Sequence, residues 1–377
     1  MRILVGVLAL LAVLTVPASA SDAIRVALQE SVRLTELRGT DIEISALPAG
    51  GPGEPGRCDG CPRWRADIVR AVWAGPAIEI AGYRAPAFRL RSEQPMRLGG
   101  REYGPAVDLL LNGEGFAIVN ELPLEEYLVG VVRAEAGEAW PREALRAQAI
   151  VARTYAAYRR IIGAGKPYHI TASTAHQQYA GRVPPSSPIW GAVRETAGQV
   201  LRWEGELFPA FYHTESGGYT EDPRTVFAAP NMPALKPVVC QFSAGSPHFY
   251  WTLDLRLAQL SELLRRNGTD VGTVRAIEVT ERTPSLRATL VSVRGTHGVV
   301  RLRGNDFRRI VGYDTLKSTL FAVAVDREVA RFAGRGYGHG VGLCQWGAKG
   351  MAEQGYAARK ILEFYYPGTM LGFLDRR

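Results

Sequence analysis

Glu135 is the residue whose surroundings point most directly to chemistry. It follows an apolar run from Leu122 to Val132, and Gly137 and Pro141 come shortly after it. Glycine and proline interrupt helices, so the pattern places a single acid at the end of a helix, facing a cleft. A carboxyl in a half-apolar environment can keep its proton near neutral pH and donate it.

Two glycine-rich segments, 211–222 and 334–348, also hold residues that could act in catalysis or binding. Glycine allows tight turns and the close approach of a ligand. A histidine in such a loop often only hydrogen-bonds the backbone, so the pattern alone is weak evidence for a site. The candidates in these segments are His213, Ser216, His339, Cys344 and Gln345.

The segment after Pro141 carries two long polar side chains, Gln148 and Arg153, among small residues. Both need partners if they are buried, so they are predicted to hold the Glu135 loop or to contact a ligand. Two nearby acids, Glu138 and Glu143, are the closest rivals of Glu135, and Glu143 suits the first turn of a helix. Tyr179, Tyr212, Tyr337 and Trp346 could stack on a ligand, although core packing is the default for aromatic residues.

The elements that must position these residues form a mixed pattern. Alternating apolar and polar residues predict strands over 24–112, and 109–120 reads as a hairpin turned at Asn112–Gly113. The order of elements is mixed rather than βαβ throughout, which predicts an α+β fold. We expect a β-rich N-terminal part and a helix pair packed on sheets around a cleft. The other predicted elements are helices at 124–135, 141–162 (slim, alanine-rich, central, with Pro141 in the first helical position), 254–267, 344–354 and 357–365, loops and short strands over 168–250, and strands over 273–332.

The first 20 residues have the features of a secretion signal. Arg2 precedes an apolar stretch over 3–16, and Ala18-Ser-Ala20 is a small-residue cleavage site. This predicts an exported protein, in a periplasm, at a wall or outside the cell. No later stretch is long and apolar enough to predict a membrane span. The predicted division of the chain is 1–20, a β-rich part over 21–112, and a third segment over 113–377.

The whole chain of 377 residues has a formal net charge of +8, and removal of the signal leaves about +7. A mildly basic exported protein could be attracted to acidic polymers or lipid headgroups. No basic run is interleaved with aromatic residues, so no nucleic-acid groove is predicted.

Four cysteines are present, and only two lie close together. Cys58 and Cys61 fall in a Gly/Pro-rich stretch, which in an exported protein predicts a local disulfide. Cys240 and Cys344 stand alone, and their spacing leaves their pairing open. A zinc site would need a second close pair, so neither a metal site nor a cofactor is predicted.

Several motifs follow one another in a fixed order across 24–377. They are the block Leu124–Arg153, Tyr212-His-Thr-Glu-Ser-Gly-Gly218, Phe307-Arg-Arg-Ile-Val-Gly312, Gly334-Arg-Gly-Tyr-Gly-His-Gly-Val-Gly342 and Tyr365-Tyr-Pro-Gly-Thr369. With these motifs the chain resembles the SpoIID/LytB family, and Glu135 matches the catalytic glutamate of that family. The resemblance implies a SpoIID-type catalytic core over 113–377 and an enzyme that acts on bacterial peptidoglycan. Family members implicated in sporulation cut glycan strands stripped of stem peptides, and others are described as enhancers of wall amidases.

The resemblance implies a lytic transglycosylase. Protonated Glu135 would donate to the glycosidic oxygen between N-acetylmuramic acid and N-acetylglucosamine, and the muramic 6-hydroxyl would attack its own C1. Because the substrate supplies the nucleophile, one carboxylate can act as acid and then as base, whereas glycoside hydrolases use two. The substrate-binding or supporting residues would be Gln148, Arg153, Tyr179, His213, Ser216, His339 and Gln345.

The chain departs from the family pattern in places. Ala136-Gly137 stands where the family usually has Met-Pro, and Cys344 stands where Ser is common. Some clostridial members have a zinc site built from a His/Cys cluster after the Gly-Gly loop, whereas here only Cys240 and His248 follow it.

Two alternatives stay open. One is a non-catalytic glycan-binding activator of a cell-wall amidase, in which Glu135 would not be needed. The other is a cysteine hydrolase using Cys344 with His339, for which no orienting acid is obvious.

Overall fold

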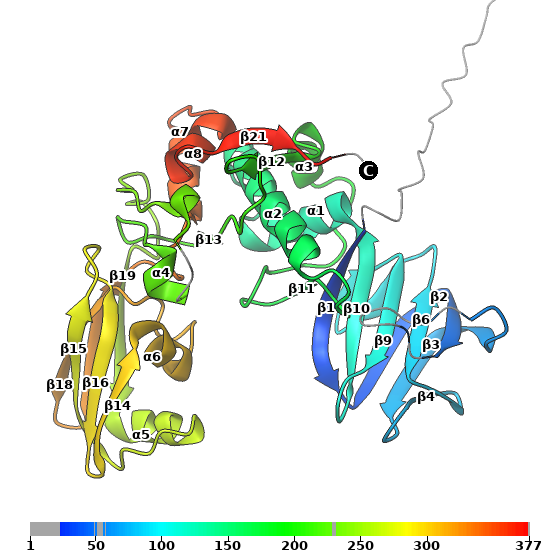
Figure 1. Cartoon of the computed structure of the whole chain (residues 1–377), viewed down its shortest axis with the longest axis horizontal. Coiled ribbons are helices and arrows are strands. Elements are labelled where there is room, and N and C mark those ends of the chain that lie inside the picture. The colour runs from blue at the N-terminus through cyan, green and yellow to red at the C-terminus, as the bar shows by residue number, and fades with distance from the viewer. Residues whose placement is uncertain (1–22, 49, 51–55, 57, 228–230, 376–377) are drawn as a thin grey trace, which may run out of the picture.

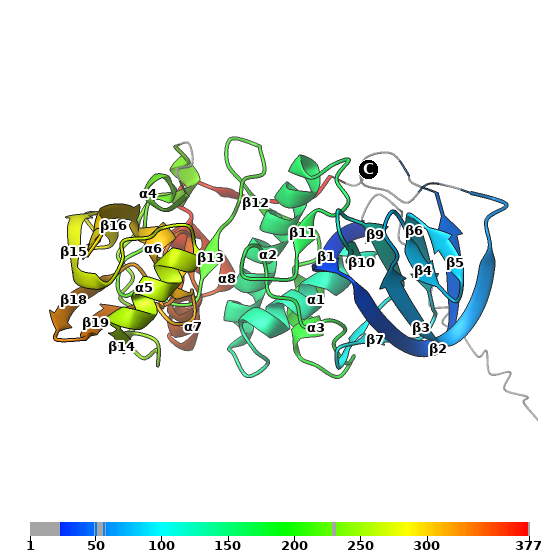
Figure 2. The ribbon, with the colours of Figure 1, turned by 90° about the horizontal axis from the view of Figure 1, so that it is seen from below.

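The structure is a computed structural model that describes residues 23–48, 50, 56, 58–227 and 231–375. The predicted signal at 1–20 lies outside the described residues. A β-rich part, a helical layer and a second β-rich part follow one another, which confirms the α+β prediction. Figure 2 shows the helices α1, α2 and α3 between the two β-rich parts.

The N-terminal part is one large, mainly antiparallel sheet of eleven strands among the described residues. Its main path runs β11-β1-β10-β9-β6-β2-β3-β4-β5, and β7 and β8 attach beside β2. The division predicted at residue 112 falls between two paired strands of this sheet, β9 and β10, and stays a proposal. The strands are β1 (Ala23–Val32), β2 (Leu34–Leu47), β3 (Arg63–Trp73), β4 (Ile78–Ile80), β5 (Tyr83–Ala85), β6 (Ala87–Arg91), β7 (Met96–Leu98), β8 (Arg101–Tyr103), β9 (Ala106–Leu111), β10 (Phe116–Pro123) and β11 (Ile170–Thr171).

The predicted hairpin is present as β9 and β10, and Asn112 and Gly113 lie in its turn. The last paired residues are Leu111 and Phe116, so four residues connect the strands. The N–H of Asn112 donates to the carbonyl of Gly115 at 2.9 Å, and Gly113 has a φ of 59°. The predicted turn at Asn112–Gly113 is therefore confirmed as part of a four-residue connection.

The helical layer consists of α1 (Leu124–Glu135), α2 (Arg142–Ile162) and α3 (Ile189–Glu195). Buried alanines make α2 slim, and α1, α3, α7 and α8 all contact it, which confirms its central position. Pro141 is the cap that precedes α2, with φ −55° and ψ 140°, and not its first helical residue. A ψ in the extended region lets the chain enter the helix from outside while the proline ring keeps its preferred φ.

The second β-rich part has its own apolar core. The predicted helix at 254–267 begins only at Leu257, because the preceding residues form a strand that pairs antiparallel with β19. The helix α6 was not predicted. The elements are β14 (Tyr250–Arg256), α5 (Leu257–Arg266), β15 (Val274–Arg282), β16 (Ala288–Gly295), β17 (Gly298–Arg303), α6 (Gly304–Val311), β18 (Phe321–Asp326) and β19 (Val329–Arg335); they lie together on one side in Figure 1.

A third apolar core is formed by residues of α2, of segment 201–240 and of the C-terminal segment. Segment 168–250 is mostly loops and short strands, as predicted, but it also contains α3 and the short α4. The remaining elements are β12 (Gln199–Arg202), β13 (Tyr212–His213), α4 (Pro223–Phe227), a 3-10 helix η2 (Pro233–Leu235), β20 (Leu343–Cys344), α7 (Gln345–Glu353), α8 (Ala358–Tyr365) and β21 (Met370–Phe373).

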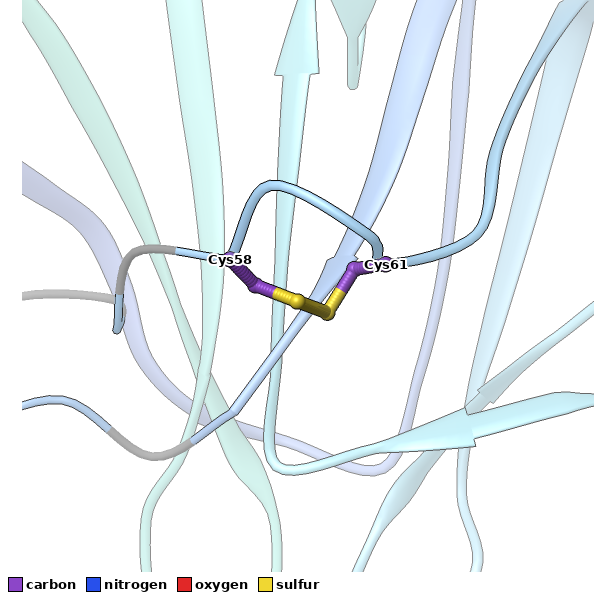
Figure 3. The surroundings of a disulfide bond; sticks show 2 residues. All are labelled: Cys58 and Cys61. Carbon is purple, nitrogen blue, oxygen red and sulfur yellow. A yellow bond between two sulfur atoms is a disulfide. The ribbon is translucent and has the colours of Figure 1, made fainter.

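The predicted local disulfide between Cys58 and Cys61 is confirmed, with the two Cα atoms 5.5 Å apart (Figure 3). Cys240 and Cys344 are both buried and carry free thiols. Over the described residues, none of the helices has the length and apolar character needed to cross a bilayer.

Candidate active site

Glu135 is the last residue of α1, and the local sequence explains why it stands there. Strand β10 ends at Pro123 and runs directly into α1, so the large sheet sets the direction of the helix. Gly137 then adopts a φ of +81°, a left-handed conformation that glycine takes at low cost at a helix end. The backbone leaves the helix axis immediately after the acid, and the side chain keeps part of its surface accessible.

Three donors fix the two carboxylate oxygens of Glu135. The backbone N–H of Gln178 donates to Oε1 at 2.7 Å, and the hydroxyl of Tyr212 donates to the same oxygen at 3.4 Å. The side-chain amide of Gln345 donates to Oε2 at 3.2 Å. Residues that are far apart in sequence therefore hold the acid in one orientation.

The donor from Gln178 depends on a close approach between a loop and α1. A Cβ on Gly130 would lie 2.4 Å from the ring of Tyr179 and 2.5 Å from the carbonyl oxygen of Gly181. The absence of this Cβ allows the N–H of Ala180 to reach the carbonyl of Gly130. The loop also gains an anchor where the hydroxyl of Tyr127 donates to Gln177 at 3.0 Å.

Tyr212 and Gln345 reach the acid through one short parallel strand pair. Strands β13 and β20 pair with Tyr212 opposite Leu343 and His213 opposite Cys344. Helix α7 begins at the next residue, Gln345, and the thiol of Cys344 accepts the N–H of Gly347 at its start. The glycine-rich segments 211–222 and 334–348 are thus brought together, and each supplies one donor.

The electrostatics favour a protonated Glu135. Burial raises the pKa of its carboxyl, while the donors from Gln178, Gln345 and Tyr212 act in the opposite direction. Burial and the nearby Glu135 also raise the pKa of Tyr212 well above its ordinary value, so this phenol stays a donor. Among the described residues, no second carboxylate contributes to the shift in the pKa of Glu135.

The other residues predicted on and near α2 are buried. Arg153 is fully buried and holds Glu125, at the opposite end of α1, through two contacts of 2.8 and 2.7 Å. Tyr179 is buried with its ring against Tyr127. Gln148 is also buried, and its amide nitrogen has no hydrogen-bond partner among the described residues. None of the three has a recorded hydrogen bond to Glu135.

A second group of chemically capable side chains has no hydrogen bond to Glu135 among the described residues. We call His213, Glu215, Cys240, His339 and Cys344 the buried cluster. Burial lowers the pKa of His213 well below its ordinary value and that of His339 to about 3. Both rings are therefore neutral near pH 7, and their centroids lie 5.6 Å apart.

Backbone contacts hold the buried cluster in place. His213 Nδ1 meets the carbonyl of Val341 at 3.1 Å, and His339 Nδ1 accepts the N–H of Val341 at 3.0 Å. The hydroxyl of Ser216 accepts the N–H of Gly218 at 3.3 Å. The predicted candidates His213, Ser216 and His339 thus form the packing of the glycine-rich loops.

The sequence interpretation missed three residues of these two sites. The Gln178 contact is a backbone donor, so no residue type could have revealed it. Tyr127 falls in the apolar run before Glu135 and looks there like core. Arg287 is buried beside the cluster and donates to the carbonyl of Ser216 at 2.5 Å; only an isolated arginine in a strand-rich segment marked it.

The cysteine-hydrolase alternative gains nothing from this arrangement. Cys344 is fully buried, and burial raises the pKa of its thiol well above the ordinary value. A nucleophilic cysteine needs a lowered pKa and access to substrate. Among the described residues no group of three or more His, Cys, Asp or Glu side chains could hold a metal ion.

The rival acids are engaged elsewhere. Glu138 is exposed and lies 3.4 Å from Arg133. Glu143 pairs with Arg146 at 2.8 Å and accepts the N–H of Ala358 at 2.7 Å. The aromatic candidates separate in a similar way, since Trp346 and Tyr337 are partly exposed whereas Tyr179 is buried.

Comparisons with known proteins match two segments of this chain to family models and give several relatives. The family model described as Stage II sporulation protein matches residues 112–203, and a model described as a domain of unknown function (DUF8618) matches residues 239–342. An uncharacterized protein of Brachyspira hyodysenteriae is 31% identical over 299 residues, covering 78% of this chain and 79% of that protein.

Two relatives come from Bacillus subtilis. Stage II sporulation protein D is 28% identical over 274 residues, covering 68% of this chain and 76% of its own length. The amidase enhancer is 30% identical over 292 residues, covering 65% of this chain but only 40% of its own length. The chain belongs to the SpoIID/LytB family, and its role is related to the cell wall.

Proposed function

We propose that this protein is a lytic transglycosylase that cleaves peptide-stripped glycan strands of peptidoglycan between N-acetylmuramic acid and N-acetylglucosamine. The observation that carries the proposal is the single carboxylate at the site. Among the described residues, the groups that hydrogen-bond Glu135 are amide and phenol donors, and none of them is a carboxylate. Hydrolysis of a glycoside generally uses a second carboxylate about 5–9.5 Å from the first, so a nucleophile within the substrate fits this site better.

The reaction then needs one proton donor that later accepts a proton. Glu135 gives its proton to the glycosidic oxygen, the bond from that oxygen to C1 of the muramic acid breaks, and N-acetylglucosamine leaves with a 4-hydroxyl. The 6-hydroxyl oxygen of the same muramic acid bonds to C1, and its proton passes to the Glu135 carboxylate. The product has a 1,6-anhydro end, no water is consumed, and the acid is restored.

The hydrogen bonds assign the proton to one oxygen. Within the described part of the chain, Oε1 accepts two donors, from Gln178 and Tyr212, whereas Oε2 accepts one, the Gln345 amide. Oε2 therefore keeps a lone pair that can carry the proton toward the substrate. The raised pKa of Glu135 keeps this acid protonated at higher pH than an exposed glutamate.

The place of action follows from the proposed substrate. Glycan strands lie outside the cytoplasmic membrane, and the sequence of residues 1–20 predicts export. A local disulfide between Cys58 and Cys61 suits an oxidising compartment.

Mass spectrometry of the products tests the proposal. Purified protein and its Glu135→Gln variant are incubated with intact and with peptide-stripped glycan strands. We expect anhydro-ended fragments from the wild type only, and more from the stripped strands. Fragments with reducing ends, or equal cleavage by the variant, would exclude the mechanism.

A second candidate function is activation of a cell-wall amidase without cleavage of the glycan. The 30% identity to a protein named amidase enhancer favours it. In this case Glu135→Gln would stimulate a purified amidase as well as the wild type does, and neither protein would release sugar fragments.

A further inference from the structure

A cavity that the proposed reaction does not use lies beside the loop that supplies the Gln178 donor. It has a volume of about 620 Å³, which is in the range of small-ligand sites. Its walls come from the last turn of α1, from the loop between residues 180 and 185, and from the hairpin of β7 and β8. Helix, loop and hairpin therefore enclose a space that Glu135 does not line.

The lining of the cavity has a net positive charge. Arg101, Arg133 and Arg182 line it, whereas Glu102 is the single acid among the described lining residues. Glu102 forms an ion pair with Arg97 at 2.9 Å, so its charge is already balanced by an arginine outside the lining. The cavity therefore favours a ligand with negative charge.

Two of the three lining arginines keep donors for such a ligand. The guanidinium of Arg182 is exposed and has neither a hydrogen bond nor an ion pair within the described part of the chain. Arg101 donates to the carbonyl of Tyr179 at 2.9 Å, and it also contacts the phenol of Tyr103. A guanidinium has five N–H donors in one plane, so Arg101 is held in place and still has donors to spare.

The third lining arginine has a weakly held partner. Nε of Arg133 lies 3.4 Å from the carboxylate of Glu138, and both side chains are 41% exposed. An exposed ion pair of this kind contributes little to stability. A ligand with more than one negative charge can therefore replace Glu138 as the partner of Arg133.

Local backbone geometry gives the cavity its shape before a ligand binds. Gly181 has a φ of +79°, and a Cβ there would lie 2.5 Å from the carbonyl oxygen of Glu102. Without that Cβ the loop packs against the hairpin, and the N–H of Arg182 donates to the same carbonyl at 2.7 Å. Pro184 and Pro185 restrict the backbone of the loop further along. A preformed site loses little freedom on binding, which favours affinity.

The cavity lies close enough to Glu135 for one glycan strand to reach both. Arg182 follows Gln178 by four residues in the same loop, and four residues span at most about 14 Å. The N–H of Gln178 donates to Glu135 at 2.7 Å. Arg133 precedes Glu135 by two residues on α1, a rise of about 3 Å. A unit of the strand near the cleaved one can thus place a substituent in the cavity.

We propose that this cavity binds a phosphate ester carried on the 6-oxygen of a muramic acid unit in the same glycan strand. A phosphate monoester has close to two negative charges near pH 7 and three acceptor oxygens. Guanidinium groups bind such oxygens through paired N–H donors, and three arginines suit this charge better than that of one carboxylate. The headgroups of a flat bilayer fit a cavity between a helix and a hairpin less well. The inference rests on the proposed function and deepens it, because it names a second feature of the strand that is cleaved.

The proposed reaction restricts where this phosphate can stand. The 6-hydroxyl of the muramic acid at Glu135 attacks C1, so its oxygen must carry no substituent. A phosphate on the 6-oxygen is therefore compatible with cleavage only on another muramic unit of the strand. The cavity would direct cleavage to an unsubstituted unit near a phosphorylated one, and a phosphoryl-transfer reaction must supply that strand.

Calorimetric titration with matched glycan tetrasaccharides tests the site. Every probe lacks stem peptides and has two muramic units. Two isomers carry a phosphate monoester on the 6-oxygen of one unit or of the other, and the third probe is the same strand after phosphatase treatment. The protein carries Glu135→Gln so that the probes stay intact. We expect one phosphorylated isomer to bind at least about tenfold tighter than the dephosphorylated strand, which corresponds to about 1.4 kcal/mol.

Variants in the cavity give the decisive comparison. Arg182→Ala and Arg133→Ala should each remove most of the preference for the phosphorylated strand. Both side chains are exposed, so their substitution is compatible with folding. Arg301→Ala is the matched control and should keep the preference, since Arg301 is an exposed arginine on β17 outside the cavity.

Several outcomes would overturn the inference. They are equal binding of the phosphorylated and dephosphorylated strands, a preference that survives both cavity variants, and an equal loss of preference in Arg301→Ala. Binding of inorganic phosphate as tight as that of the phosphorylated strand would reduce the cavity to a site for the free ion. Displacement of the strand by vesicles of anionic phospholipid would assign the cavity to headgroups instead.

Cleavage assays with Glu135 intact separate this inference from the proposed function. We expect the phosphorylated isomer that binds tightly to yield an anhydro end on its unsubstituted muramic unit. Anhydro products without a preference for phosphate would reject the phosphate site and leave the reaction in place. A preference for phosphate without anhydro products from any strand would reject the reaction and leave the binding result to stand by itself.

Discussion

The Glu135 site and the buried cluster both hold residue types that can act in catalysis, but four of the five side chains of the buried cluster are buried, whereas Glu135 and His339 are partly exposed. Glu135 keeps part of its surface accessible, and its three donors come from segments that meet around it. The buried cluster has two histidines, two thiols and an acid, and its side chains are enclosed or held by the backbone. Access and donor geometry, more than residue type, therefore distinguish a reactive group from a structural one.

Burial acts on both regions but with different consequences. It raises the pKa of Glu135 and so leaves a proton available for donation at an accessible place. In the buried cluster it keeps His213 and His339 neutral near pH 7 and the thiol of Cys344 protonated, and of these three side chains only His339 is partly exposed. Burial therefore favours the protonated, proton-donating form of Glu135, whereas it weakens the histidines of the buried cluster as bases and the thiol of Cys344 as a nucleophile.

The contrast between the two regions would be wrong if a residue of the buried cluster contributed as much to the rate of glycan cleavage as Glu135 does. We expect Glu135→Gln to lower the rate of glycan cleavage by about 10²–10⁴-fold, the usual contribution of a general acid. His339→Asn keeps an acceptor for the N–H of Val341 and should lower the rate by less than about tenfold. Initial rates on stripped strands measure both. A loss in His339→Asn equal to that in Glu135→Gln would make the histidine part of the reaction.

Gly130 tests how far the packing of α1 determines the geometry of Glu135. Alanine at this position would collide with Tyr179 and with the carbonyl of Gly181, and the shifted loop would withdraw the Gln178 donor. We expect a loss of roughly 1–3 kcal/mol of stability, as for other overpacked sites, and a fall in kcat by about tenfold or more. Thermal unfolding and steady-state kinetics give the two values.

Gly191 in α3 is the matched control for this substitution. Its added Cβ would meet only Glu195 Oε1, at 3.9 Å. Because alanine favours a helix over glycine, Gly191→Ala should be neutral or stabilising by up to about 1 kcal/mol. Unchanged kinetics in Gly130→Ala would show that the loop adapts and that the Gln178 donor is dispensable.

Glu215 makes the stability of the buried cluster depend on pH. Burial raises the pKa of its carboxyl from 4.5 to about 7. The unfolded chain releases this proton near pH 4.5 but the folded protein keeps it until about pH 7, so stability falls as pH rises through this window. Between pH 5 and pH 8, the free energy of unfolding of the wild type should fall by roughly 1–3 kcal/mol relative to that of Glu215→Gln.

Chemical denaturation of both proteins across this pH range measures the difference. The neutral histidines act in the opposite direction, because they destabilise the fold when pH falls below about 6.5. Subtracting the free energy of unfolding of the variant from that of the wild type at each pH removes the contribution of the histidines, which both proteins share. A constant difference across the range would mean that Glu215 is ionised in the folded protein.

The sequence predicted those parts of the fold that local pattern determines. The helices at 124–135, 345–353 and 358–365 have strong apolar periodicity or clear boundaries, and they were found to within a residue or two. The helix at 254–267 was misplaced at its start, because pairing with β19 extends the strand across residues that could also be helical. Tertiary pairing overrides local propensity there.

The candidate site was predictable only in part, for a related reason. Glu135 and Gln345 stand in recognisable motifs, whereas the donor from Gln178 is a backbone group that only folding brings to the acid. His213 and Ser216 were candidates because of their chemical types, and the structure shows them packed among glycine-rich turns. Burial is a property of the fold that no single motif reveals.

The smallest predicted effect is a shift in the pKa of Glu135, and its size should differ between variants of the two side-chain donors, Gln345 and Tyr212. Gln345→Met removes the amide bonded to Oε2 and should raise the pKa of Glu135, since that donor stabilises the carboxylate. A hydrogen bond of about 0.5–1.5 kcal/mol corresponds to roughly 0.4–1 pH unit. Glu135 acts as the protonated acid, so the alkaline limb of kcat/KM should move to higher pH. Tyr212→Phe should shift it less, because its contact is longer, at 3.4 Å. A limb that moves to lower pH in Gln345→Met would show that the amide stabilises the protonated form.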